Sequence, residues 1–98
     1  MTSRRISDIQ RKTLKILYWL NVREGINHLP VPTTALFKMV AKNTQHTIAA
    51  SNYRTSCHTL VERGILNQYR NPKTARLAVD LTPYGTQLAK EICDKDGD

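Results

Sequence analysis

Residues 60–85 read LVERGILNQYRNPKTARLAVDLTPYG, and this stretch decides the fold. After Gly64 the apolar residues change from helical to alternating spacing, which predicts two strands, "ILNQYR" and "ARLAVDL". The "NPKT" between them forms a turn, because Asn71 starts it and Pro72 fixes φ at the next position. Cations surround this predicted hairpin: Arg63, Arg70, Lys73 and Arg76. A hairpin that only closed a core would have little need for them.

Three helices are predicted before the hairpin. Ser7 and Gln10 have the spacing of a capping box, and apolar residues then recur at helical steps, so the first helix spans about 8–24 and ends at Gly25. "NHLPVP" cannot be helical, because its two prolines force extended geometry, and a short strand fits there. Thr33 is the expected N-cap of a second helix over 34–42.

The third helix is expected to end at Arg63. Its start is left open, because Thr47 and Ser51 are both suitable caps. The positions expected to face inward are Ala49, Tyr53, Cys57, Leu60 and Val61.

A final helix is predicted after the hairpin, with Thr82 as the cap and Pro83 at the first helical position. The predicted fold is α+β and mainly α: three helices, a two-stranded hairpin with a further short strand, and a C-terminal helix. Residues 1–6 are expected to form a flexible arm, 7–93 the domain, and 94–98 an acidic disordered tail. Two helices joined by a polar turn and followed by a hairpin are a DNA-reading arrangement.

The charge distribution favours a polyanionic partner. The chain has 98 residues and a formal charge of +7, yet Glu62 is the only carboxylate between Gly25 and Val79. The same span carries seven cations: Lys38, Lys42, Arg54, Arg63, Arg70, Lys73 and Arg76. Such asymmetry raises the surface potential and favours nucleic acid, although a surface that is only solubilising remains an alternative.

Two short motifs stand at the ends of the predicted hairpin: the first consists of Leu60, Glu62, Gly64, Ile65 and Leu66, and the second of Leu81, Thr82, Gly85, Leu88 and Ala89. Together they resemble the end of a winged helix-turn-helix domain, as in MarR-like and PadR-like transcription regulators. The resemblance implies a fold in which the third helix enters the DNA major groove. MarR-like proteins dimerise through terminal helices longer than the stretch after Leu81, so the first helix, with Tyr18 and Trp19, is the alternative dimer surface.

Candidate DNA-binding residues follow from the outward positions of the third helix. If its apolar positions face inward, its outer face carries Asn52, Arg54, Thr55, His58 and Thr59. From their side-chain donors and acceptors, Arg54 is a candidate to pair with guanine, or Asn52 with adenine. Ser51, near the helix start, can donate to a phosphate. The alternative reading is a solvated helix face, although such a face usually carries Asp or Glu, and the outer face of this helix is expected to carry neither.

The hairpin supplies the remaining candidates. Arg70, Lys73 and Arg76 flank its tip and are expected to contact phosphates or the minor groove. Arg63 is expected to complement the dipole of the helix that it ends.

Catalytic and metal sites are not expected. Cys57 and His58 are adjacent, but neighbours on a helix diverge, so Cys57 is read as a buried apolar residue. His28 and His46 lie in polar loops without a carboxylate partner, and no triad or phosphate loop is present. No enzyme activity, cofactor or small-molecule ligand is predicted.

The sequence therefore predicts sequence-specific binding of double-stranded DNA by a small transcription regulator, acting as a homodimer. A winged helix that binds only protein, as an assembly adaptor, is the alternative, and a replication or plasmid-maintenance role is a third. No apolar run approaches the roughly 20 residues that span a bilayer, and no signal-peptide stretch follows the N-terminal charges, so a cytoplasmic protein is expected.

Overall fold

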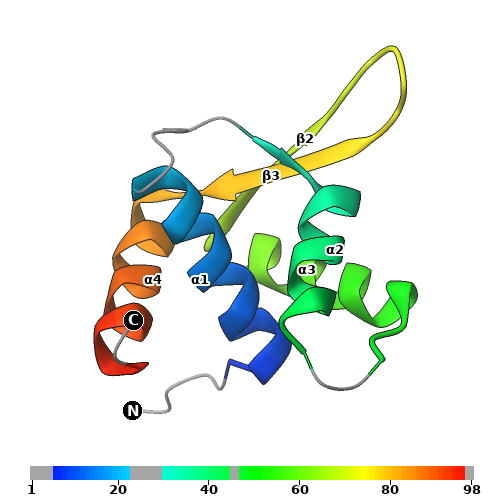
Figure 1. The fold of residues 1–98 in the computed structure, drawn as a ribbon. Coiled ribbons are helices and arrows are strands. Elements are labelled where there is room, and N and C mark those ends of the chain that lie inside the picture. The colour runs from blue at the N-terminus through cyan, green and yellow to red at the C-terminus, as the bar shows by residue number, and fades with distance from the viewer. Residues whose placement is uncertain (1–5, 23–29, 45–46, 97–98) are drawn as a thin grey trace.

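The computed structural model describes residues 6–22, 30–44 and 47–96. Within these ranges the order is α1 (Asp8–Val22), β1 (Val31–Pro32), α2 (Thr33–Lys42), α3 (Ala50–Glu62), β2 (Leu66–Arg70), β3 (Leu77–Leu81) and α4 (Pro83–Asp96). The predicted order of elements is confirmed. Figure 1 shows α1 and α4 side by side, with α2 and α3 on the other side of α1.

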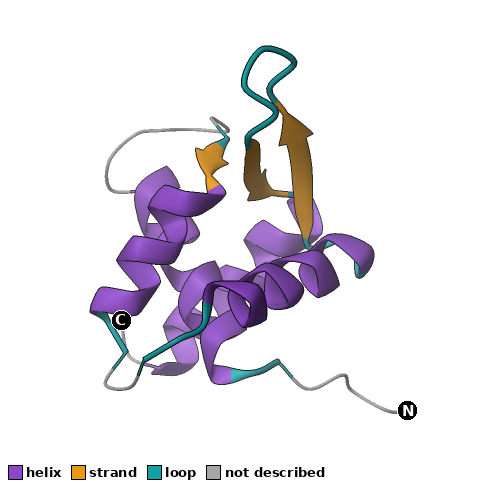
Figure 2. Cartoon of the chain, turned by 90° about the vertical axis from the view of Figure 1, so that its right-hand side faces the viewer, coloured by secondary structure: helices purple, strands orange, loops and turns teal. Residues whose placement is uncertain are grey.

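The three strands form one antiparallel sheet in the order β1-β3-β2. The short strand predicted around the two prolines pairs with β3, with Val31 opposite Val79. Strands β2 and β3 form the expected hairpin, which we call the wing, residues 66–81. The tip of the wing extends beyond the helices in both views (Figures 1 and 2).

The start of α1 confirms the capping box. The backbone N–H of Ser7 donates to Gln10 Oε1 at 3.0 Å, and the backbone N–H of Gln10 donates to Ser7 Oγ at 3.1 Å. These two bonds satisfy donors that have no partner within a helix. The helix is described to Val22, and Gly25, its predicted stop, lies outside the described residues.

The predicted cap of α2 is wrong. Thr33 is the first helical residue, Pro32 occupies the cap position, and no side chain caps the helix. The Thr33 hydroxyl instead donates to the Leu77 carbonyl oxygen at 3.1 Å. This hydrogen bond ties the start of α2 to β3.

The start of α3 also differs from both predicted alternatives. The helix begins at Ala50, and the cap residue Ala49 is extended, with φ −71° and ψ 136°, and forms no side-chain cap. Ala49, expected inside, is exposed, whereas Ile48 is buried. Burial of Ile48 brings the chain to the core at that point, so packing sets the helix start in place of a hydroxyl cap.

The connections at the two ends of the wing, from α3 into β2 and from β3 into α4, occur where the sequence predicts them. Gly64 has φ +75°, which a glycine adopts without strain, and it turns the chain from α3 into β2. The Thr82 hydroxyl donates to the Gly64 carbonyl oxygen at 2.7 Å and accepts from the backbone N–H of Gly85 at 2.9 Å. A side chain on Gly85 would collide with the backbone carbonyl of Ile65, so α4 packs directly against the start of the hairpin.

Helix α4 continues to Asp96, three residues beyond the domain boundary that the sequence predicts at 93. Residues 1–5 of the predicted arm and 97–98 of the predicted tail lie outside the described residues. No helix in the described ranges combines the length and apolar character needed to cross a bilayer.

The core joins all four helices to the sheet. Its buried members include Leu14, Leu17, Leu36, Val40, Tyr53, Cys57, Leu60, Val79, Leu81 and Ala89. One buried charge was not anticipated: Asp80, only 6% exposed, accepts from Asn67 Nδ2 at 3.1 Å and lies 3.4 Å from the Tyr69 hydroxyl. These polar partners offset the cost of removing a carboxylate from water.

Candidate nucleic-acid interface

The outer face of α3 is where the sequence placed it. Ser51, Asn52, Arg54, Thr55 and His58 are exposed, and Thr59 is half-buried. In Figure 1 the first turns of α3 lie at the right-hand side, toward which the tip of the wing also projects.

Buried contacts on the opposite face fix the orientation of α3. The Thr13 hydroxyl donates to the Ile9 carbonyl oxygen at 2.9 Å, so the buried Tyr53 hydroxyl is the donor in its 3.1 Å contact with Thr13. The Tyr53 ring also packs on Phe37 of α2, with the ring centroids 5.2 Å apart. Because α1 and α2 both hold the same side chain, the helix cannot rotate about its axis without breaking buried contacts.

A second buried bond acts one turn further along α3. Gln10, 7% exposed, donates through Nε2 to the Ser56 carbonyl oxygen at 3.2 Å. The same side chain completes the capping box of α1. The start of α1 and the middle of α3 are therefore held by one residue.

The donors available on the outer face are fewer than the sequence suggests. The Thr55 hydroxyl donates to the Ser51 carbonyl oxygen and the Thr59 hydroxyl donates to the Thr55 carbonyl oxygen, both at 3.1 Å. Both hydroxyl hydrogens are thus used within the helix. Arg54 and Asn52 make no side-chain hydrogen bond or ion pair to another described residue, and their donors remain available to a ligand.

The expectation of a carboxylate-free face is wrong at its C-terminal end. His58 Nε2 lies 3.5 Å from Glu62 Oε2, and both side chains are about two-thirds exposed, at 65% and 66%. An exposed pair of this kind contributes little to stability. Its effect is to set a negative charge beside His58, so the face favourable to phosphate is limited to the earlier turns, around Asn52 and Arg54.

The tip of the wing is ordered by its own backbone. The side-chain oxygen of Asn71 accepts from the N–H groups of Lys73 at 2.8 Å and Thr74 at 3.3 Å. The Asn71 N–H donates to the Arg76 carbonyl oxygen, the Ala75 N–H to the Asn71 carbonyl oxygen, and the Arg76 N–H to Thr74 Oγ1. Since Pro72 has no N–H, every backbone donor from 71 to 76 is used. The tip therefore offers side-chain cations, not backbone amides, to an anion.

The loop is larger than the predicted four-residue turn. Ala75 has φ +59°, a left-handed conformation that is uncommon for a residue with a side chain. This residue closes the loop by returning the chain to β3. Arg70, Lys73 and Arg76 are all exposed, and their side chains make no hydrogen bond or ion pair to other described residues.

Strand register shows which way Arg70 projects. It lies opposite Leu77, and alternation places it on the same face of the hairpin as the core residues Val79 and Leu81. That face is turned toward the helices, so Arg70 lies on the side of the wing that α3 also occupies. Gln68, opposite Val79, is exposed on this face as well and was not singled out from the sequence, although strand alternation would have identified it.

No metal centre is found in the part of the chain that the structure describes, where no three His, Cys, Asp or Glu side chains cluster. His28 and His46 lie outside that part. Cys57 is buried as predicted, at 5% exposed, and burial raises the pKa of its thiol. Cys57 therefore stays in its neutral thiol form and packs as an apolar side chain in the core.

The chain matches no family model and no curated protein sequence. Its fold matches several solved structures at low identity. The adhesin competence repressor AdcR from Streptococcus pyogenes has a TM-score of 0.68 and 16% identity, over 95% of this chain and 59% of that one. The PcaV transcriptional regulator from Streptomyces coelicolor, solved with its natural ligand, has a TM-score of 0.68 and 18% identity, over 99% and 60%.

The third match is closer to this chain in size. The SSV1 protein F-93 has a TM-score of 0.63 and 13% identity, over 95% of this chain and 93% of that one. By contrast, this chain spans only 59% and 60% of the lengths of AdcR and PcaV. The chain has the winged helix-turn-helix fold that its resemblance to MarR-like regulators implied.

Proposed function

We propose that this chain binds double-stranded DNA as a small transcription regulator, with α3 in the major groove and the wing on the adjacent backbone or minor groove. The observation that supports the proposal is that the first turns of α3, which include Arg54, and the tip of the wing, which Arg70 and Arg76 flank, project to the same side in Figure 1. The side chains of these arginines are exposed and make no bond to other described residues.

The proposal includes two kinds of contact with DNA, one to phosphates and one to base edges. Phosphate contacts from Arg70, Lys73 and Arg76 would position the domain without reading sequence. Arg54 and Asn52, whose donors are available, would read base edges. A single domain of this size covers a limited stretch of DNA, so we propose a homodimer on a two-fold site.

The first test is fluorescence anisotropy with a random-sequence duplex at several salt concentrations. Each phosphate contact contributes about 0.9 to the slope of log K against log [salt], so the double variant Lys73→Ala with Arg76→Ala should lower the slope by up to about 2. Arg54→Ala should weaken binding to a selected site more than binding to random DNA. Absence of binding at low salt would refute the proposal.

Matched controls come from α4, which lies at the opposite side of Figure 1. Lys90→Ala is the control for Arg54→Ala, and Lys90→Ala with Lys95→Ala is the control for the wing pair; all of these are exposed cations. Equal effects of the α4 and wing pairs would show that net charge, and not the wing, determines binding. The mass of each variant in solution is checked in parallel.

The proposal assigns no catalytic activity to the chain. The PcaV structure holds a natural ligand, whereas the expectation that this chain needs no small molecule stays a prediction. Whether the regulated process is transcription or plasmid maintenance depends on the preferred DNA site, which selection from a random duplex library would identify.

A further inference from the structure

Thr55 and Thr59 of α3 use their hydroxyl groups in the same way, and this use limits what they can offer to a base. Each hydroxyl donates at 3.1 Å to the backbone carbonyl oxygen of the residue four positions earlier, Ser51 for Thr55 and Thr55 for Thr59. A carbonyl oxygen only accepts, so the single hydroxyl hydrogen of each threonine lies in this bond. The threonine oxygen can still accept a hydrogen bond from a ligand, but it has no hydrogen left to donate.

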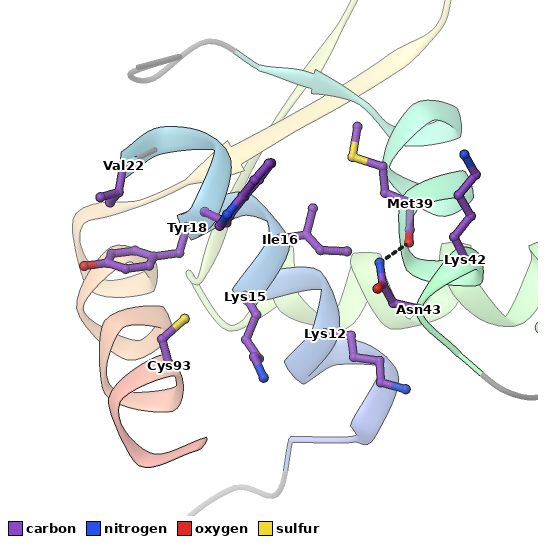
Figure 3. Close-up of a pocket in the computed structure, with 10 residues that line it drawn as sticks. Lys12, Lys15, Ile16, Tyr18, Val22, Met39, Lys42, Asn43 and Cys93 are labelled. Atoms are coloured by element: carbon purple, nitrogen blue, oxygen red, sulfur yellow. Dashed lines mark hydrogen bonds between the residues drawn. The ribbon is translucent and has the colours of Figure 1, made fainter. Parts of the chain in front are cut away.

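A comparable bond just after α2 shows why the number of hydrogens matters. Figure 3 draws it beside the groove that α1, α2 and α4 form and that Trp19 lines: Asn43 Nδ2 donates to the Met39 carbonyl oxygen at 2.8 Å. The amide nitrogen of Asn43 carries a second hydrogen and can donate it to another group. A threonine in the same arrangement has no second hydrogen.

The bond that holds the hydroxyl group of Thr55 also fixes the methyl group of that side chain. Oγ1 and Cγ2 of a threonine branch from the same Cβ, so a bond that holds Oγ1 against the helix backbone selects one χ1 rotamer and one position for Cγ2. A base that touches this methyl group therefore meets a side chain that is already ordered, and no further rotamer entropy is lost.

Helical spacing places Thr55 near the middle of the outer face of α3. It lies two residues from Tyr53 and two from Cys57, which is a rotation of about 200° at roughly 3.6 residues per turn. Thr55 therefore points away from both of these buried side chains, and it is exposed. Arg54 and Asn52 are each one residue from Tyr53, so they lie on the two flanks of the outer face. Of these three residues, Thr55 points most directly outward.

We propose that Thr55 is a specificity-determining residue that reads the C5 methyl group of a thymine through its own methyl group. In the major groove thymine presents this methyl group beside the acceptor O4, and guanine presents the two acceptors O6 and N7. An oxygen that cannot donate forms no hydrogen bond with any of these acceptors, so the apolar contact is what distinguishes the bases. The inference rests on the proposed placement of α3 in the major groove and names the base that Thr55 prefers there.

The same side chain offers one other way to read a base. Its oxygen could accept from the amino group of cytosine or of adenine. That oxygen, however, is the branch held against the helix, 3.1 Å from the Ser51 carbonyl oxygen, which leaves the methyl group as the branch free to contact a base. The two readings predict different effects of a methyl group on cytosine, and the experiment below separates them.

The test uses the full chain and the site selected from the random duplex library. Each thymine of that site is replaced in turn by deoxyuridine, which removes only the C5 methyl group, and Kd is measured by fluorescence anisotropy. We expect one of these replacements to weaken wild-type binding by about fourfold, the effect of burying one methyl-sized group. At the same position 5-methylcytosine should bind more tightly than cytosine by a similar factor.

Two substitutions separate the methyl group of Thr55 from its hydroxyl group. Thr55→Ser removes the methyl group, so thymine and deoxyuridine should bind equally well. Thr55→Val keeps a methyl group at that position, so the preference for thymine should survive, and valine and threonine have similar helix propensities. Thr86→Ser on α4 is the matched control, because the Thr86 hydroxyl also donates to a carbonyl oxygen four residues earlier, that of Thr82 at 3.0 Å. Circular dichroism of each variant checks that the fold is intact.

The inference is overturned if no thymine replacement changes the affinity, if Thr55→Ser keeps the preference for thymine, or if Thr55→Val loses it. Loss of the preference in Thr59→Ser alone would also overturn it. Cytosine that binds as tightly as 5-methylcytosine would show that the oxygen, and not the methyl group, reads the base. All of these results come from a protein that binds DNA, whereas a chain that binds no duplex at low salt refutes the proposed function itself, so the two failures are distinguishable.

Discussion

Helix α3 and the tip of the wing both present cations on the proposed DNA side, but they are held in different ways. Tyr53 of α3 is fixed by α1 and α2 through buried contacts, and its exposed neighbour Arg54 inherits that orientation. The wing tip extends beyond the helices and is ordered by hydrogen bonds within residues 71–76. Changes to the inner face of α3 should therefore affect stability and DNA reading together, whereas changes at the tip should affect DNA binding almost alone.

The largest effect is expected from Tyr53→Ala. The side chain is 1% exposed, and its loss leaves a cavity between three helices, which should lower the free energy of unfolding by about 3–5 kcal/mol. Urea unfolding measures this. Tyr84→Ala, at 58% exposed, is the matched control and should change stability by less than about 0.5 kcal/mol. Similar losses for both would show that α3 is not held as described.

Gly85→Ala tests the joint between the wing and the helices. A methyl group there would collide with the Ile65 carbonyl, so the backbone must move, and a loss of about 1–3 kcal/mol is expected. Thermal unfolding measures the change. Gln87→Ala, on the exposed face of the same helix, should be near neutral. A neutral Gly85→Ala would mean that α4 can withdraw from the hairpin at no cost.

Tyr53→Phe separates the hydroxyl from the ring. Losing the bond to Thr13 should cost about 0.5–1.5 kcal/mol at neutral pH. Burial, followed by the coulombic effect of Cys57, raises the pKa of Tyr53 well above its usual value of 10.0. Above about pH 10 the unfolded chain releases this proton and the folded chain keeps it, so wild-type stability falls as pH rises.

The readout is the difference between the wild type and Tyr53→Phe in urea unfolding from pH 8 to 11. The variant should lose less stability over the alkaline range, because lysine titration is common to both proteins. Parallel curves for the two would contradict a buried, proton-holding Tyr53.

The smallest effect on stability is expected at Asn71. Asn71→Ala removes the acceptor for the Lys73 and Thr74 amides at an exposed site, which should cost less than about 1 kcal/mol. Faster hydrogen exchange at those two amides would report the loosened tip. Asn71→Asp keeps the acceptor but adds a negative charge, so it should preserve amide protection and still weaken DNA binding. Equal DNA affinity for Asn71→Asp and the wild type would show that the tip of the wing does not contact DNA.

Much of the fold could be read from the sequence where a residue and its partner are three or four positions apart. The Ser7–Gln10 box and the Thr82–Pro83 helix start are both confirmed. Each depends on backbone geometry that the local residues fix by themselves. The exposed face of α3 was likewise predictable, because helical spacing places Tyr53, Cys57 and Leu60 on the opposite face.

The sequence could not decide between a local and a distant partner for the same polar group. Thr33 was read as a cap, yet its hydroxyl bonds to Leu77, and Thr55 and Thr59 use their hydroxyl hydrogens within α3. The start of α3 depended on the burial of Ile48. Buried Asp80 became acceptable only because strand register brings Asn67 opposite it.

The sequence alone determined the order of elements, the winged helix class, the basic character and the cations of the wing, because these depend on spacing and composition. Tertiary structure decided which donors remain available, which side Arg70 occupies, and how α1, α2 and α4 form a groove around Trp19. The physical reason is that hydrogen bonds and apolar contacts between distant segments depend on how the elements pack, and packing is a property of the whole chain.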